Sequence, residues 1–241
     1  MLSAASSDRL PERHIRIPGT RNLRDVGGYP ATDGRRTRWR TLLRTDRLDR
    51  LSAESQARLV ALPLRQVIDL RWPHELEAHP SVFAASDRVR YRSIPLLDDN
   101  PPETTVAGVY RRMLDERGAQ IAAVVRALLE PAGLPAVIGC AAGKDRTGVT
   151  IAVVLTAVGV PRHDVVSDYV LSSECFATPV PGAPADDPVD GPIAVECDPS
   201  WIGDTLDHLE RRHGGARALL VRNGLTHADV DRLAEVLTEP R

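Results

Sequence analysis

Short apolar runs alternate along this chain with longer segments whose apolar residues recur every three or four positions. The first pattern is typical of strands and the second of amphipathic helices. Strands that alternate with helices favour the α/β class, with a largely parallel, twisted sheet and helices on both faces. The expected strands are residues 14–17, 39–44, 66–70, 88–94 and 135–138, and the expected helices are 52–61, 103–116, 119–130 and 147–157, followed by further helices to the C-terminus.

Capping residues mark several of these boundaries. Ser52 is expected to cap the first helix through its side-chain oxygen. Pro161 is expected to open a helix at its first position, where the missing N–H costs nothing. Thr226 with Asp229 predicts a capping-box variant before the last helix. Pro73 is expected to close the third strand.

The length favours a single domain. A chain of 241 residues can form one large domain or two small ones, and we expect one domain over residues 1–241. Within it, residues 1–13 are expected to be a flexible tail and residues 98–102 a loop. The Pro- and Asp-rich residues 177–199 are interpreted as a surface excursion, or the edge of a flexible lid, rather than a domain boundary.

Composition excludes several classes of partner. The formal charge is −2, the pI is about 6.4, and only 3 Trp, 4 Tyr and 2 Phe are present, which argues against nucleic-acid binding. No apolar run approaches the ~18 residues that could span a membrane. Cys140, Cys175 and Cys197 are odd in number and widely spaced, which favours a reduced compartment. We therefore expect a cytoplasmic protein, with a monomer slightly favoured.

The strongest chemical signal follows the strand at 135–138, where Gly139 to Gly148 read Gly-Cys-Ala-Ala-Gly-Lys-Asp-Arg-Thr-Gly. A six-to-seven-residue loop over a helix N-terminus points successive backbone N–H groups inward and forms an anion-binding nest. The same positive field favours the nucleophilic thiolate of Cys140. The planar guanidinium of Arg146 can hold two phosphoryl oxygens. This spacing predicts a thiolate that attacks a phosphoryl group.

The other loop residues have expected roles in binding. Ala141, Ala142 and Gly143 are small enough to let the backbone approach a bound phosphate. Lys144 would add a second cation for a substrate with more than one phosphate, although it could also be a solvated side chain. Thr147 can place a hydroxyl near the sulfur and steady it as the leaving group of a second step.

Three other interpretations of this loop exist. A lone cysteine between a strand and a helix is often only a small buried side chain. A nucleotide-binding P-loop is excluded, because Gly139 and Gly143 enclose three residues rather than four and Asp145 follows the lysine. Sulfur transfer of the rhodanese type also uses a cysteine in a loop of N–H groups, and it remains a rival.

The loop resembles the signature of cysteine-dependent protein tyrosine phosphatases, in the variant Cys-x-Ala-Gly-Lys-Asp-Arg-Thr-Gly of the bacterial tyrosine/serine, or triple-specificity, family. Further motifs similar to that family occur in order at residues 22–29, 43–45, 68–71 and 168–172, so the resemblance spans about residues 15–240. It implies a protein tyrosine phosphatase-like fold. It also implies phosphomonoester hydrolysis through a phosphocysteine on Cys140, with neither metal nor cofactor.

The resemblance favours phosphorylated tyrosine, or tyrosine and serine, in proteins as the substrate. The alternatives are phosphoinositides or a small phosphorylated metabolite. A second alternative is a degenerate module that binds phosphate without turnover. Gly139 departs from the family, which normally has His before the nucleophilic cysteine. This departure predicts weaker support of the thiolate and a slower enzyme, and a gain in turnover for Gly139→His.

Cleavage of an ester also needs a proton for the leaving oxygen. Asp145 is the first candidate, because similar phosphoinositide-type loops are thought to use an aspartate in this place. It could instead only accept hydrogen bonds from the loop. Asp69, Asp98 and Asp99 are the reserve candidates for the acid.

Residues of the other family-like motifs are candidates for the substrate pocket. Arg24, Asp69 and Arg71 are expected to line it, together with Asp25. The alternative is a buried Asp–Arg pair that braces the loop.

No histidine spacing predicts a metal site. His74 and His79 are five residues apart rather than four, and Pro80 follows them. His208 and His213 repeat that offset and are interpreted as surface residues. Cys175 and Cys197 are most simply inert thiols.

Overall fold

A computed structural model describes residues 13–97, 105–178, 180 and 196–240. The expected tail, apart from Arg13, and the expected loop at 98–102 lie outside the described residues. So does most of the excursion at 177–199.

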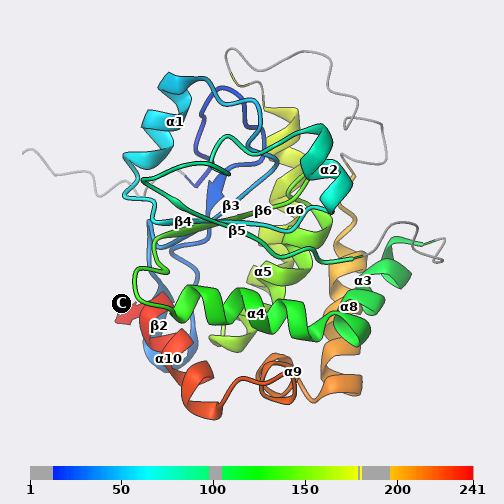
Figure 1. The fold of residues 1–241 in the computed structure, drawn as a ribbon. Helices are drawn as coiled ribbons and strands as arrows, with labels where there is room; N and C mark the ends of the chain where they lie inside the picture. The colour runs from blue at the N-terminus through cyan, green and yellow to red at the C-terminus, as the bar shows by residue number, and fades with distance from the viewer. Residues whose placement is uncertain (1–12, 98–104, 179, 181–195, 241) are drawn as a thin grey trace, which may run out of the picture.

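A five-stranded sheet organises the described part of the chain, in the order β1-β3-β6-β4-β5 (Figure 1). Strands β3, β6, β4 and β5 run parallel, and the short edge strand β1 is antiparallel to β3. The expected α/β class with a largely parallel sheet is confirmed. The strands are β1 (Arg24–Asp25), β3 (Leu42–Thr45), β6 (Ala136–Gly139), β4 (Gln66–Asp69) and β5 (Arg90–Ser93).

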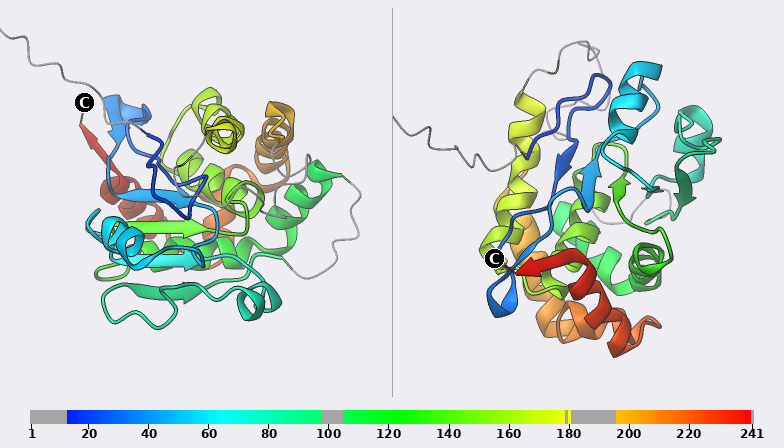
Figure 2. Two further views of the ribbon diagram at one scale, coloured as in Figure 1. Left: turned by 90° about the horizontal axis from the view of Figure 1, so that it is seen from above. Right: turned by 90° about the vertical axis from the view of Figure 1, so that its left-hand side faces the viewer.

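Both faces of the sheet are buried, because successive strand residues point to opposite sides. Ile68 and Ile138 pack into the larger apolar cluster, which most of the helices share. Val67 and Val137 pack into a smaller cluster on the other face with Leu59 of helix α1. Helices thus lie on both sides of the sheet, as Figures 1 and 2 show. They are α1 (Ala53–Val60), α2 (Pro73–Ala78), α3 (Val106–Glu116), α4 (Gly118–Leu129), α5 (Asp145–Ala157), α6 (Arg162–Ala177), α8 (Pro199–His213), α9 (Ala216–Arg222) and α10 (His227–Leu237).

Most of the expected caps are present. The Ser52 side chain accepts a hydrogen bond from the Ser55 backbone N–H at the start of α1. The Thr226 and Asp229 side chains form a capping box at the start of α10. Pro161 is the N-cap of α6 and so lies one position before the expected one.

Several local predictions were wrong. Residues 14–17 form no strand, since only His14 makes an isolated bridge, to Arg24. The strand expected at 39–44 begins at Leu42. Pro73 does not close the strand, because β4 already ends at Asp69 and Pro73 is the first residue of α2. The sequence also gave no sign of the small sheet in which β2 (Arg35–Thr37) pairs with the C-terminal β7 (Thr238–Pro240).

No helix in the described ranges is both long enough and apolar enough to cross a membrane.

Candidate active site

Cys140 lies where the carboxyl ends of three parallel strands meet. It directly follows Gly139, the last residue of the central strand β6, whose backbone is in register with Thr45 of β3 and Asp69 of β4. Helix α5 then begins at Asp145. The crevice outside the carboxyl ends of parallel strands is the usual place for a ligand in such a sheet, and here a helix N-terminus opens onto it.

The loop between β6 and α5 is held from outside through its carbonyl groups. Three consecutive carbonyls accept hydrogen bonds: Ala141 from Arg47 N at 3.1 Å, Ala142 from Asn22 Nδ2 at 2.9 Å and Gly143 from Arg44 Nη2 at 2.7 Å. Gly143 has a φ of +68° and Lys144 a φ of −101°, the alternation of hands that produces an anion nest. With its carbonyls held by the surrounding protein on the outside, the loop has the shape that turns N–H groups toward an anion.

Cys140 and Thr147 are both buried at this junction. The Cys140 side chain is 3% exposed and belongs to the larger apolar cluster. Thr147 is fully buried, and its hydroxyl oxygen has no hydrogen-bond partner among the described protein groups. A buried hydroxyl without a partner costs free energy. This agrees with a hydroxyl that forms its hydrogen bond to a bound ligand or to the sulfur of Cys140.

The guanidinium of Arg146 is fixed from two sides. Its Nη1 and Nη2 donate to the two carboxylate oxygens of Glu75 at 2.5 and 2.8 Å, and its Cζ lies 4.6 Å from the centroid of the Trp72 ring. Burial by itself would raise the pKa of Glu75, but the bonds and charge of Arg146 lower it overall. No motif in the sequence had pointed to Glu75 as a residue of the site. Its signal is the capping position in α2, where the carboxylate also accepts from Trp72 N at 2.7 Å.

Asp145 sits at the end of a chain of phenols. Tyr110 donates to Asp145 Oδ1 at 2.5 Å, and the Tyr110 and Tyr169 hydroxyls lie 2.7 Å apart. Burial raises the pKa of both tyrosines well above the usual value, so they stay neutral donors. The Asp145 side chain keeps 38% of its surface exposed. It can therefore reach a ligand as well as accept from Tyr110.

Lys144 is buried rather than solvated. Its Nζ donates to the carbonyl of Glu196 at 3.1 Å, lies 5.4 Å from the centroid of the Trp201 ring and is 3.5 Å from Asp145 Oδ1. The alternative of a solvated side chain is therefore wrong. The ammonium group lies at the phosphate loop, where it adds positive charge beside Asp145.

Arg24 lies in a buried ion network behind the loop. It is 0% exposed, and its Nη2 donates to the Asp168 carbonyl at 2.6 Å and to Ser172 Oγ at 3.0 Å. Arg44 joins the network through a bond of 2.5 Å from Nη1 to Asp168 Oδ2. These contacts favour the bracing alternative for Arg24 over the substrate pocket. Asp25 is also occupied, by the N–H groups of Gly27 and Arg40.

Asp69 and Arg71 form a second buried pair. Three bonds of 2.8 to 3.2 Å join the Arg71 Nε and Nη2 to the Asp69 carboxylate, and Tyr91 Oη donates to the same group at 3.1 Å. Arg71 Nη1 donates to the His79 carbonyl at 2.8 Å. With both residues engaged, these contacts again favour bracing. Asp98 and Asp99 lie outside the described residues.

Gly139 is enclosed by the neighbouring strand. A Cβ placed on it would lie 2.8 Å from Thr45 Cγ2, 3.2 Å from Thr45 O and 3.1 Å from Asp46 O. Real Cβ atoms essentially never approach other atoms to 2.8 Å. The expectation that Gly139→His simply improves loop support is therefore wrong, because Thr45 fills the space that the side chain needs.

The two other cysteines are buried, and burial raises the pKa of the thiols of Cys175 and Cys197. A raised thiol pKa disfavours the thiolate. This agrees with their interpretation as inert thiols.

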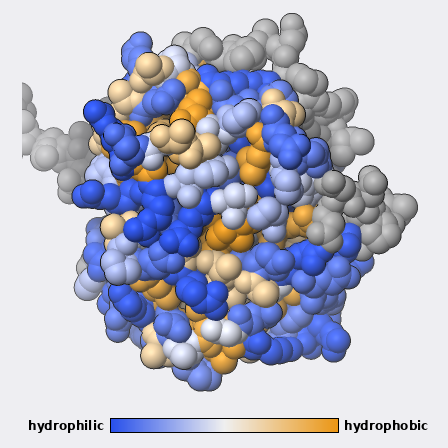
Figure 3. Space-filling model, in the orientation of Figure 1, coloured by the Kyte–Doolittle hydropathy of each residue, from blue (hydrophilic) through white to orange (hydrophobic). Residues whose placement is uncertain are grey.

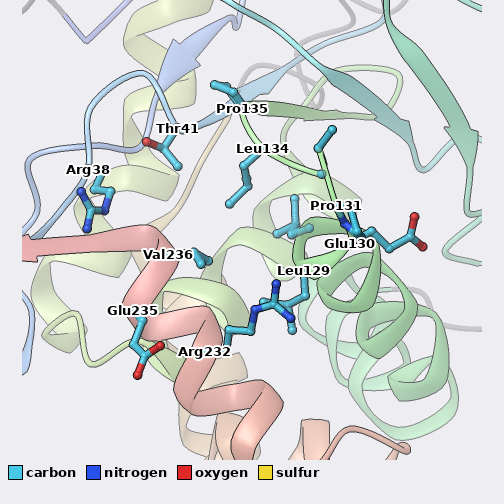
Figure 4. Close-up of a pocket in the computed structure, with 13 residues that line it drawn as sticks. Arg38, Thr41, Leu129, Glu130, Pro131, Leu134, Pro135, Arg232, Glu235 and Val236 are labelled. Carbon is cyan, nitrogen blue, oxygen red and sulfur yellow. The ribbon is translucent and has the colours of Figure 1, made fainter.

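A hollow in the surface lies at the end of β6 opposite Cys140. Leu134 and Pro135, which precede that strand, line it together with Arg38, Arg232 of α10 and other residues (Figure 4). Cys140 follows the strand and is five residues from Pro135, or ~16 Å along an extended chain. The hollow is therefore a different place from the phosphate loop.

Among the described residues, the surface in Figure 3 shows no continuous apolar face, because hydrophilic residues lie between the apolar ones.

The N-terminus of α5 thus brings together an anion nest, a cysteine and the guanidinium of an arginine. This combination suits the transfer of a phosphoryl group to a thiolate, which is the chemistry of cysteine-dependent phosphatases. The model of the tyrosine phosphatase family matches residues 15–239, and the chain belongs to that family. The expected enzyme class is thereby confirmed.

Two sequence relatives agree with this assignment. A tyrosine-protein phosphatase of Nostoc commune is 25% identical over 212 residues, which cover 79% of this chain and 72% of that protein. The triple specificity protein phosphatase PtpB of Mycobacterium tuberculosis is 30% identical over 194 residues, covering 66% and 68%. The crystal structure of P. aeruginosa TpbA superposes with a TM-score of 0.38 at 20% identity, covering 59% of this chain and 77% of that one. The α/β fold is defined by the order and direction of the strands in the sheet and not by this superposition.

Proposed function

We propose that this chain is a single phosphatase domain that hydrolyses phosphotyrosine in proteins through a phosphocysteine on Cys140, without a metal ion. The observation that carries the proposal is the loop itself. Its three carbonyls are tied outward, and Arg146 is held by Glu75 at the start of α5. Backbone N–H groups and a guanidinium preorganised in this way stabilise the charge of a transferring phosphoryl group.

In the first step, Cys140 Sγ attacks phosphorus as the bond to the ester oxygen breaks. Asp145 gives its proton to that leaving oxygen. In the second step, water attacks phosphorus, Asp145 takes a proton from the water, and the P–S bond breaks to return the thiolate. Arg146 and the loop N–H groups hold the phosphoryl oxygens in both steps, while the Thr147 hydroxyl steadies the departing sulfur.

The relatives named as tyrosine-protein and triple specificity phosphatases support a phosphoprotein substrate. The buried ammonium group of Lys144 favours one alternative, a substrate with more than one phosphate, such as a phosphoinositide.

The decisive experiment compares wild-type protein, Cys140→Ser and the control Cys175→Ser on p-nitrophenyl phosphate in EDTA. Wild type and the control are expected to turn over. Cys140→Ser is expected to lose turnover yet still bind phosphate, because the nest and Arg146 remain. Residual hydrolysis by Cys140→Ser would exclude the covalent route. A wild type that binds phosphate without turnover would establish the degenerate module instead. Phosphotyrosine peptides, phosphoinositides and sugar phosphates then rank the substrate classes.

A further inference from the structure

Two histidines and an aspartate converge at the ends of two helices, away from Cys140. Asp115 is the penultimate residue of α3, and His208 and His213 lie in the last two turns of α8. Asp115 Oδ1 is 2.8 Å from His208 Nε2 and 2.7 Å from His213 Nε2. His213 is 8% exposed, so its interpretation as a surface residue was wrong. Helices α3 and α8 pack side by side, which brings the three residues together (Figure 1).

We propose that Asp115, His208 and His213 form a binding site for a divalent transition metal, with Zn²⁺ the best match. One ligand atom from each residue lies within 4.8 Å of the others. Two imidazole nitrogens and a carboxylate oxygen are a ligand set that suits Zn²⁺, whose ligands stand about 2.0–2.2 Å from the ion. The side chains of Asp115 and His208 are 39% and 19% exposed, which leaves room for water as a fourth ligand.

The two helix ends favour a cation here, whereas the arginines Arg211, Arg212 and Arg222 nearby oppose it. Both helices end at this point, since α3 ends at Glu116 and α8 at His213, and helix C-termini carry partial negative charge. The nearby guanidinium of Arg222 donates to the backbone carbonyl of His213. A metal ion would take the place of the two hydrogen bonds that now meet at Asp115 Oδ1, and the N–O separations would widen by a few tenths of an ångström.

Such an ion would join two helices that both reach the phosphate loop. Tyr110 of α3 donates to Asp145, and Trp201 of α8 lies beside the Lys144 ammonium group. The bound ion would thus stabilise the packing of α3 against α8, the two helices that contact the phosphate loop. It takes no part in the chemistry at Cys140, so EDTA is expected to leave hydrolysis running.

The test measures Zn²⁺ binding to full-length protein that carries Cys140→Ser, because a reactive thiol would itself take the ion. After dialysis against EDTA, calorimetry with ZnCl₂ is expected to give one site. His208→Gln and Asp115→Asn in this background are each expected to weaken binding at least ~10-fold. His163→Gln is the matched control, because exposed His163 contacts the carboxylate of its neighbour Asp164 in the same way, at 3.3 Å.

Thermal unfolding and Co²⁺ spectra separate a metal site from a hydrogen-bonded bridge. Zn²⁺ at about a hundred times Kd is expected to raise the Tm of the Cys140→Ser protein by about 5–10 °C and to do little for His208→Gln. A Co²⁺ spectrum without sulfur charge-transfer bands is expected, since no thiol is a ligand. Three outcomes would overturn the proposal. They are a Kd for Zn²⁺ above about 100 µM, binding by the His208→Gln and Asp115→Asn variants that is as tight as that of the Cys140→Ser protein, or sulfur charge-transfer bands in the Co²⁺ spectrum.

Discussion

The guanidinium of Arg146 and the carboxylate of Glu75 face each other in two parallel hydrogen bonds of 2.5 and 2.8 Å. Arg146 is the second residue of α5 and Glu75 lies in the first turn of α2, so the pair joins two helices through residues 71 positions apart in the chain. A bidentate pair of this kind fixes the plane of the guanidinium as well as its position. Glu75 therefore acts through Arg146 as a positioning residue.

Glu75→Gln tests this positioning role. We expect kcat/KM for p-nitrophenyl phosphate to fall about 10-fold to 100-fold, because a guanidinium displaced by even 1 Å supports the transition state poorly. The exposed neighbour Glu77 provides the control, and Glu77→Gln should keep full activity. A loss of thermal stability in Glu75→Gln with unchanged kcat/KM would show that the pair only stabilises the fold.

Arg146→Lys tests whether the planar guanidinium is needed to bind two phosphoryl oxygens. The lysine keeps the charge but cannot hold two phosphoryl oxygens at once, so kcat is expected to fall by at least ~10²-fold. Equal activity of the two proteins in steady-state kinetics would place Arg146 outside the catalytic machinery.

Asp145→Asn tests the general acid. Alkyl phosphates need a proton on the leaving oxygen, whereas p-nitrophenolate leaves almost unaided, so the variant is expected to lose far more activity on the alkyl substrate. Tyr110→Phe removes the hydrogen bond to Asp145 Oδ1 and is expected to give a smaller loss with the same bias. Equal losses on both substrates would assign Asp145 to loop structure and return Asp69, Asp98 and Asp99 to consideration.

Gly139→His is expected to destabilise the protein and lower turnover. The new side chain collides with Thr45, and overpacking of this kind costs about 1–3 kcal/mol. Thr45→Ser removes Cγ2 but keeps the hydroxyl that donates to Asp46. The double variant is therefore expected to regain part of the stability that Gly139→His loses. Additive effects of the two substitutions in urea unfolding would show that Thr45 does not limit the space.

Asp168→Asn is expected to lower the free energy of unfolding by about 3–5 kcal/mol, because it leaves the buried guanidiniums of Arg24 and Arg44 without their counter-charge. Burial alone would raise the pKa of Asp168, yet the two arginines lower it overall. A carboxylate with a lowered pKa stabilises the fold above its unfolded value of 3.8, and this contribution is lost as pH falls further.

Unfolding as a function of pH checks the sign. The difference in stability between wild type and Asp168→Asn should be largest above about pH 5 and should shrink on acidification. The exposed Asp204 of α8 supplies the comparison, and Asp204→Asn should leave the unfolding curve nearly unchanged. A constant difference at every pH would mean that the charge of Asp168 contributes nothing.

The sequence by itself determined the strand–loop–helix at Cys140 and most of the strands and helices around it. These features are local: a Cys–Arg spacing, apolar periodicity and caps such as Ser52 all act within a few residues. Only the tertiary structure decided which groups hold the loop. Glu75 and Tyr110 come from other helices, and Thr45 comes from the neighbouring strand that leaves no space beside Gly139.

The same distinction separates Arg24, Asp69 and Arg71 from the substrate pocket. Their motifs could be recognised in the sequence, but burial and the choice of ion partner depend on which segments the fold brings together. Asp168, for example, is 144 residues from Arg24 in the chain. The sequence therefore determines the reacting groups, whereas tertiary packing determines which charged side chains are left to meet a substrate and which are consumed in holding the site.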